Sequence, residues 1–126
     1  MVTEPLRTLF GEPELVQLAE GAWQARLTLH KDHPLYAGHF PGRPVTPGVA
    51  QIQLIEQLVS RIMGERMMLC GSKAIKFLRP IDPYQNADLI IVLRLAHLDG
   101  VASCDASAEV DGHKVFSMKA EFQPLK

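Results

Sequence analysis

The sequence predicts an α+β fold in which a curved antiparallel sheet wraps around one central helix. Three observations predict it. Only one segment has helical periodicity, several segments alternate between apolar and polar residues, and two Asp-Gly pairs separate consecutive strand-like segments. The chain has 126 residues, of which 47% are hydrophobic and 21% charged. These values fit one compact domain rather than two, so we treat residues 1–126 as a single domain.

Two strands are expected before residue 31. Residues 23–29 place apolar side chains on one face and polar side chains on the other, and a weaker strand is predicted over residues 14–18. The following segment, residues 33–47, contains four prolines and two glycines. It therefore predicts a rigid loop without regular structure.

The helix is predicted to begin at Gly48 and to end near Gly64. Its expected apolar stripe has the three- and four-residue spacing of one helix face and consists of Ile52, Ile55, Val59, Ile62 and Met63. Leu54 and Leu58 lie outside this stripe, so the helix is apolar around more than half of its circumference. We expect it to be covered on several sides.

Strands are predicted again after the helix. One covers residues 67–78 and ends before Pro80 and Pro83. Three more are joined by turns at residues 99–100 and 111–112, because Asp-Gly tolerates the positive φ angles of tight hairpins. The middle strand has one face of small apolar residues, namely Ala102, Cys104, Ala106, Ala108 and Val110. Such a meander is most simply packed by curling around the helix, which is the hot-dog arrangement.

Composition excludes several classes of function. A formal net charge of −1 provides no broad positive field for nucleic acid or an anionic membrane, and we expect neither partner. The longest apolar stretch, residues 89–96, is far shorter than the roughly 20 residues that cross a bilayer. The first residues lack the pattern of an export signal, so we expect a cytoplasmic protein, with Cys70 and Cys104 as reduced core residues.

The loop and the helix start resemble a known family. Residues 39–49 read H-F-P-G-R-P-V-T-P-G-V and are similar to the H-F-P-G-x-P-x-x-P-G-V signature of the 3-hydroxyacyl-acyl carrier protein dehydratases of the FabA/FabZ type. Residues 76–83 resemble the K-F-x-R-P-V-x-P segment of that family, and residues 110–115 its late hairpin. The resemblance covers about residues 35–122, and a looser similarity extends to dehydratase-like proteins of aryl polyene pathways. It implies a hot-dog fold and an acyl-thioester substrate.

Dehydration of a 3-hydroxyacyl thioester needs a base for the C2 proton, an acid for the departing C3 hydroxyl, and a donor for the thioester oxygen. His39 is the natural base, because a histidine is largely neutral at cytoplasmic pH. The N–H groups at the helix start, near Gly48 and Val49, can polarise the thioester carbonyl, and Gly48 allows a close approach. With Phe40 and Pro47 of the same motif, they are the expected substrate-binding residues.

The family places its acid fourteen residues after the histidine and a glutamine four residues later. Here these positions hold Gln53 and Gln57. Gln57 fits and is expected to bind substrate, whereas the Gln53 amide cannot donate a proton as a general acid. Glu56 lies about 60° away around the helix and is the alternative acid. We therefore predict a catalytic set of His39, Gln53 and Glu56, with the proton supplied by Glu56 or by a water that Gln53 holds.

Two other functions compete with a dehydratase. One is a non-catalytic subunit that binds acyl thioesters; the other is a hot-dog thioesterase, in which Glu56 would activate water. No cofactor is expected, and no metal either, because the successive spacings of three residues from His30 to His33 and six from His33 to His39 do not suit a metal site.

The remaining expectations concern partners. The substrate is expected to be carried by acyl carrier protein or coenzyme A, and Lys73, Lys76 and Arg79 are candidates for a docking surface, although alternation puts Lys76 on the opposite face. The resemblance implies a homodimer or higher homo-oligomer with its sheets joined edge to edge and an acyl tunnel at the interface. It also implies a cis peptide bond between His39 and Phe40.

Overall fold

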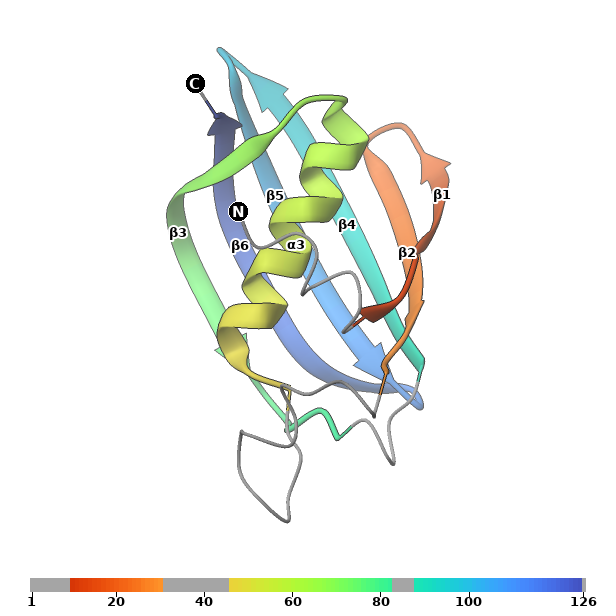
Figure 1. Cartoon of the computed structure of the whole chain (residues 1–126). Coiled ribbons are helices and arrows are strands. Elements are labelled where there is room, and N and C mark those ends of the chain that lie inside the picture. The colour runs from red at the N-terminus through yellow and green to blue at the C-terminus, as the bar shows by residue number, and fades with distance from the viewer. Residues whose placement is uncertain (1–9, 31–45, 83–87, 126) are drawn as a thin grey trace.

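The computed structural model describes residues 10–30, 46–82 and 88–125, and contains six strands and one helix in these ranges. Figure 1 shows the helix lying across the concave face of the sheet. The elements are, in chain order, β1 (Glu14–Ala19), β2 (Ala22–Thr28), α3 (Gly48–Met63), β3 (Met67–Phe77), β4 (Asp88–Leu98), β5 (Val101–Val110) and β6 (His113–Pro124).

The strands form one sheet in the order β1-β2-β4-β5-β6-β3, and every neighbouring pair is antiparallel. The predicted curved sheet around a central helix is therefore confirmed, as is the meander of β4, β5 and β6. The strand bounds differ from the predicted ones by only one residue at each affected end. In the described part of the chain, β1 and β3 are the two edge strands of the sheet.

Helix α3 is covered on several sides, as predicted, because only Val49 and Arg61 among its sixteen residues are exposed. The centre of its buried face differs from the prediction. Leu54 and Leu58, which the periodicity placed outside the stripe, are buried. Ile52, Ile62 and Met63 of the predicted stripe are only half-buried. The sheet curls around the helix, so the core accepts a broader face than the single stripe used for the prediction. The buried residues of α3 are Ala50, Gln51, Leu54, Ile55, Leu58 and Val59.

The small-residue face predicted for β5 is confirmed, since all five of its residues are buried. The same core cluster contains the fully buried rings of Phe116 and Phe122 from β6, and also Phe10 from the N-terminal segment. Small side chains on β5 therefore coexist with large ones on its neighbour. Phe10 as a core residue was not predicted, because no periodic pattern includes it.

Both predicted Asp-Gly turns have positive φ at both residues: 54° and 78° at Asp99 and Gly100, and 51° and 78° at Asp111 and Gly112. These values match a type I′ hairpin turn, whose twist suits the flanking strands. No helix in the described residues is long and apolar enough to cross a membrane.

The prediction that both cysteines are core residues is wrong for Cys70. Cys104 is buried on the inner face of β5, whereas Cys70 is exposed, and both thiols are free. Cys70 lies on the edge strand β3 where the pairing with β6 shifts register between Leu69 and Gly71. A bulge of this kind adds an unpaired residue and re-aims its side chain, which strand periodicity alone does not predict.

We expect Gly21→Ala to destabilise the fold more than Gly100→Ala. Both glycines have a positive φ, 74° and 78°, but a Cβ at Gly21 would lie 2.8 Å from the carbonyl oxygen of Leu95, and one at Gly100 meets nothing within 4 Å. The expected losses in the free energy of unfolding are about 2–4 kcal/mol and about 1 kcal/mol. Urea unfolding of both variants measures this, and equal losses would contradict the role given to the Leu95 contact.

We also expect the two cysteines to react at very different rates. Burial, reinforced by the negative charge of Asp105, raises the pKa of Cys104 to about 12. Since the thiolate is the nucleophile, Cys104 should stay inert to maleimide at pH 8, while exposed Cys70 is alkylated. Peptide mass mapping of native and urea-denatured protein gives the comparison. Equal labelling of both sites in native protein would refute the burial of Cys104.

Candidate active site

The first turn of α3 has no side-chain cap, because its N-cap residue is Pro47. The N–H groups of Ala50 and Gln51 donate to the Pro47 carbonyl oxygen at 3.1 and 3.3 Å. Gly48 and Val49, in contrast, donate their N–H groups to no acceptor in the described part of the chain. Two unused donors at the positive end of a helix dipole form a natural site for an oxygen that carries negative charge.

An aromatic ring lies directly against Gly48. A Cβ at this position would be 2.8 Å from Cζ of Phe77, so any larger residue would have to displace the Phe77 ring. The Phe77 ring also packs against the buried Phe116 ring, with centroids 5.3 Å apart, yet half of Phe77 stays exposed. Val49 and Leu78, the next residues along each segment, are exposed as well. The two free N–H groups therefore lie beside an apolar surface that suits an acyl chain.

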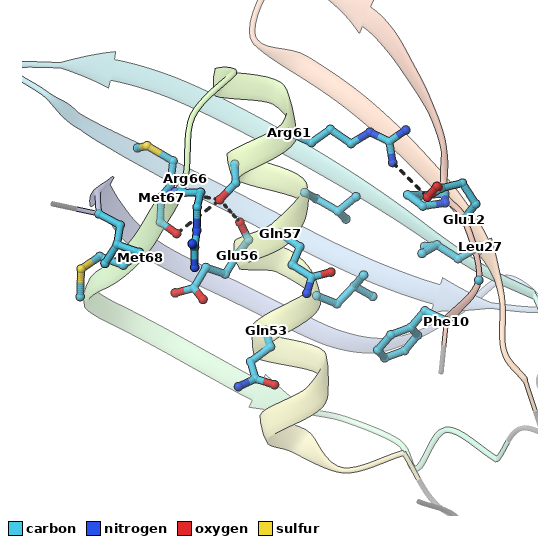
Figure 2. A pocket seen from close by; sticks show the side chains of 16 residues that line it. Phe10, Glu12, Leu27, Gln53, Glu56, Gln57, Arg61, Arg66, Met67 and Met68 are labelled. Atoms are coloured by element: carbon cyan, nitrogen blue, oxygen red, sulfur yellow. Dashed lines mark hydrogen bonds and ion pairs between the residues drawn. The ribbon is translucent and has the colours of Figure 1, made fainter. Parts of the chain in front are cut away.

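A cavity of about 660 Å³ extends along α3 and is lined by the helix, the N-terminal segment and the start of β3. It brings together Gln53, Glu56 and Gln57, the three helix residues predicted to be functional. Figure 2 shows that their side chains diverge: Glu56 points toward Arg66 and the start of β3, whereas Gln57 points toward Phe10. Two amides and one carboxylate of the same helix therefore line the cavity, but their side chains do not converge on one point.

Glu56 makes a defined hydrogen bond with the sheet. Its Oε2 accepts the Leu69 N–H at 2.8 Å. Ser60, one turn later, strengthens the same junction, because its Oγ accepts the Met67 N–H at 2.8 Å and donates to the Glu56 carbonyl oxygen at 2.8 Å. Two side chains of α3 therefore hold the first residues of β3, a role that the sequence reasoning did not assign to either.

The other predicted residues fall into two groups. Pro47, Gly48 and Val49 are at the start of α3. His39, Phe40, their connecting peptide bond and His33 lie outside the described residues. Lys73, Lys76 and Arg79 are all exposed, and the pairing of β3 shifts register between Ser72 and Ala74, which interrupts the alternation used to assign their faces. Within the described ranges, no cluster of three or more metal-ligating side chains occurs.

One polar residue that the sequence reasoning missed is Gln51. It is buried in the first turn of α3, and its Nε2 donates to the Thr46 carbonyl oxygen at 3.2 Å. The signal was present in the helical periodicity, because Gln51 precedes Leu54 and Ile55 by three and four residues and so shares their buried face.

We expect Glu56→Leu to lower the free energy of unfolding by about 1–2 kcal/mol, because it leaves the Leu69 N–H without its acceptor. Glu56→Gln keeps an acceptor oxygen and should lose less. Glu65→Leu, at an exposed position in the turn after the helix, controls for removal of a carboxylate. Urea unfolding ranks the three variants, and a Glu56→Leu protein as stable as Glu65→Leu would disprove the structural role of the bond.

The sequence is similar to a dehydratase family and to individual dehydratases. The sequence model of the ApeI-like family, described as ApeI dehydratase, matches residues 16–115. Two similar relatives are 3-hydroxyacyl-[acyl-carrier-protein] dehydratases FabZ. The one from Oenococcus oeni is 30% identical over 124 residues, 93% of this chain and 82% of the relative. The one from Mannheimia succiniciproducens is 28% identical over 107 residues, 78% and 71%.

A solved structure with the same fold is the dehydratase heterocomplex ApeI:P from Xenorhabdus doucetiae. It superposes with a TM-score of 0.71 at 20% identity and covers 89% of this chain and 98% of that chain. At this identity the match shows the hot-dog fold alone.

Proposed function

The chain belongs to the ApeI-like dehydratase family, and we propose that it removes water from 3-hydroxyacyl thioesters on acyl carrier protein, giving trans-2-enoyl thioesters for fatty acid or polyene synthesis in the cytoplasm. The observation that carries this proposal is the pair of Gly48 and Val49 N–H groups, which have no acceptor among the described residues. These two residues end the histidine motif and lie beside the half-exposed Phe77. This arrangement suits a thioester carbonyl attached to an apolar chain.

In the proposed reaction, the thioester oxygen accepts hydrogen bonds from Gly48 and Val49, which stabilises the negative charge that develops on it. His39 takes the C2 proton, the C2–H electron pair forms the C2=C3 double bond, and the C3–O bond breaks. The departing hydroxide takes up a proton and leaves as water. No cofactor or metal is needed for this elimination.

The proton for the departing hydroxide can come from Glu56 or from a bound water. One oxygen of Glu56 accepts the Leu69 N–H, and its side chain points away from Gln57. We therefore favour a water held by the Gln53 amide. This water gives a proton to the departing hydroxide, and the hydroxide that remains is neutralised by the proton that His39 took from C2. Gln57 is a further polar contact in the same cavity. In this proposal Glu56 holds the start of β3 in place and does not serve as the acid.

We propose further that the site is completed by a second subunit, as a homodimer joined at the β3 edge. The half-exposed Phe77, with exposed Leu78 and Met68 at the two ends of β3, provides apolar surface for such an interface. One subunit would supply His39 and the other Gln53. A heterodimer with a related chain is the alternative arrangement, since the similar Xenorhabdus dehydratase is a heterocomplex.

A non-catalytic subunit that binds acyl thioesters is the second candidate function. It is favoured by one specific observation: the acid position holds Gln53, and the nearby carboxylate of Glu56 is engaged with Leu69. A thioesterase would need the same carboxylate to activate water, so it fits the contacts less well.

We expect the purified protein to convert a 3-hydroxyacyl thioester to an enoyl thioester, detected by its ultraviolet absorbance, and His39→Ala to reduce kcat/KM by about 100-fold or more. Glu56→Gln should keep most of the activity. Circular dichroism checks that each variant is folded. An unchanged rate in His39→Ala would overturn the assignment of the base; release of free thiol would indicate a thioesterase, and substrate binding without either product a binding subunit.

A further inference from the structure

The junction between the loop and α3 is held by buried hydrogen bonds rather than by a cap. Thr46 is 2% exposed, and its N–H donates to the carbonyl oxygen of the fully buried Ile81 at 2.9 Å. Its own carbonyl oxygen accepts the Gln51 Nε2–H at 3.2 Å. The peptide group between Thr46 and Pro47 is therefore fixed from one side by Gln51, a residue within the helix that it precedes.

Gln51 lowers the stability of the folded chain compared with an apolar residue at the same position. The residue is 6% exposed, and its Oε1 has no hydrogen-bond partner in the described part of the chain. A buried acceptor without a donor is destabilising, and an apolar side chain of similar shape avoids that cost. Among the described residues, the amide makes one hydrogen bond, its donation to the Thr46 carbonyl oxygen.

We propose that Gln51 is a positioning residue for the reaction, because it orients the Gly48 and Val49 N–H groups through the Thr46 carbonyl. This inference rests on the proposed function of those two donors. Fixing the Thr46–Pro47 peptide group fixes the direction in which the chain enters α3. Gly48 is further confined by the Phe77 ring, so the first turn is held from the loop side and from the sheet side.

The direction of the Gly48 and Val49 N–H groups should affect kcat more than KM. Charge on the thioester oxygen is small in the bound substrate and large in the transition state, so misdirected donors affect kcat more than KM. In this proposal Gln51 does not touch the substrate oxygen, and it forms no hydrogen bond with a titratable group in the described part of the chain, so the pH dependence should not change. A purely structural residue would instead lower stability and leave the kinetic constants of the folded enzyme unaltered.

The test uses Gln51→Met, which keeps side-chain length and removes both the amide donor and the unpartnered oxygen. We expect kcat to fall about 10- to 100-fold, KM to stay within about twofold, and the melting temperature to shift by only about 3 °C. The pH profile of kcat/KM should be that of the wild type. The matched control is Ile55→Val, at a fully buried position one turn later, which should lower the melting temperature by a few degrees and leave kcat unchanged.

A second measurement keeps the inference separate from the proposed function. Isotope-edited infrared spectroscopy of a bound, unreactive thioester analogue reports how strongly the carbonyl is polarised, without any turnover. We expect the carbonyl band to move toward its free value in Gln51→Met but not in Ile55→Val. An inactive wild-type protein would refute the dehydratase, while this band would still test Gln51.

Three results would overturn the role of Gln51. The first is a wild-type kcat in folded Gln51→Met together with an unshifted carbonyl band. The second is an equal loss of kcat in Ile55→Val. The third is failure of both Gln51→Met and Gln51→Leu to fold, because that would make the amide a requirement for stability.

Discussion

The structure depends on a helix start at which two N–H groups have no acceptor among the described residues. Most helices satisfy some of these donors with a side-chain cap, but the N-cap residue here is Pro47, which has no group to offer. The order of the first turn must therefore come from tertiary contacts. They are provided by the buried Thr46, by Gln51 and by the Phe77 ring against Gly48. The donors remain available because the backbone around them is held by other groups.

The same helix forms the centre of the core and one wall of the site. Its buried face, with Leu54, Ile55 and Leu58, fixes the rotation of α3 against the sheet. With 3.6 residues per turn, that rotation places Gln53 and Gln57 on the cavity side. The packing of the helix in the core therefore sets the side of the helix on which the polar groups of the cavity lie.

How much of this was predictable from the sequence depends on the range of the interactions. Strand alternation, the two Asp-Gly turns and the helix bounds are local, and they were predicted correctly. The exposed position of Cys70 depends on a bulge in β3, and the breadth of the buried helix face depends on sheet curvature, so neither could be read from periodicity. In the site, the motif predicted the donors of Gly48 and Val49, and their role stays a prediction. The bonds from Gln51 to Thr46 and from Glu56 to Leu69 join residues whose proximity only the folded chain defines.

The bond of Glu56 also offers a physical reason for an amide at position 53. A carboxylate at position 53 would lie three residues before Glu56 on the same helix, in the same cavity, and like charges at this spacing repel each other. Glu56 keeps its carboxylate because it supports the start of β3 through Leu69. The Gln53 amide avoids the repulsion and can both donate and accept hydrogen bonds, so it can hold a water or the substrate hydroxyl. A chain that uses one carboxylate to attach its edge strand thus has a reason to use an amide at the position where the resemblance to the dehydratase signature predicts an acid.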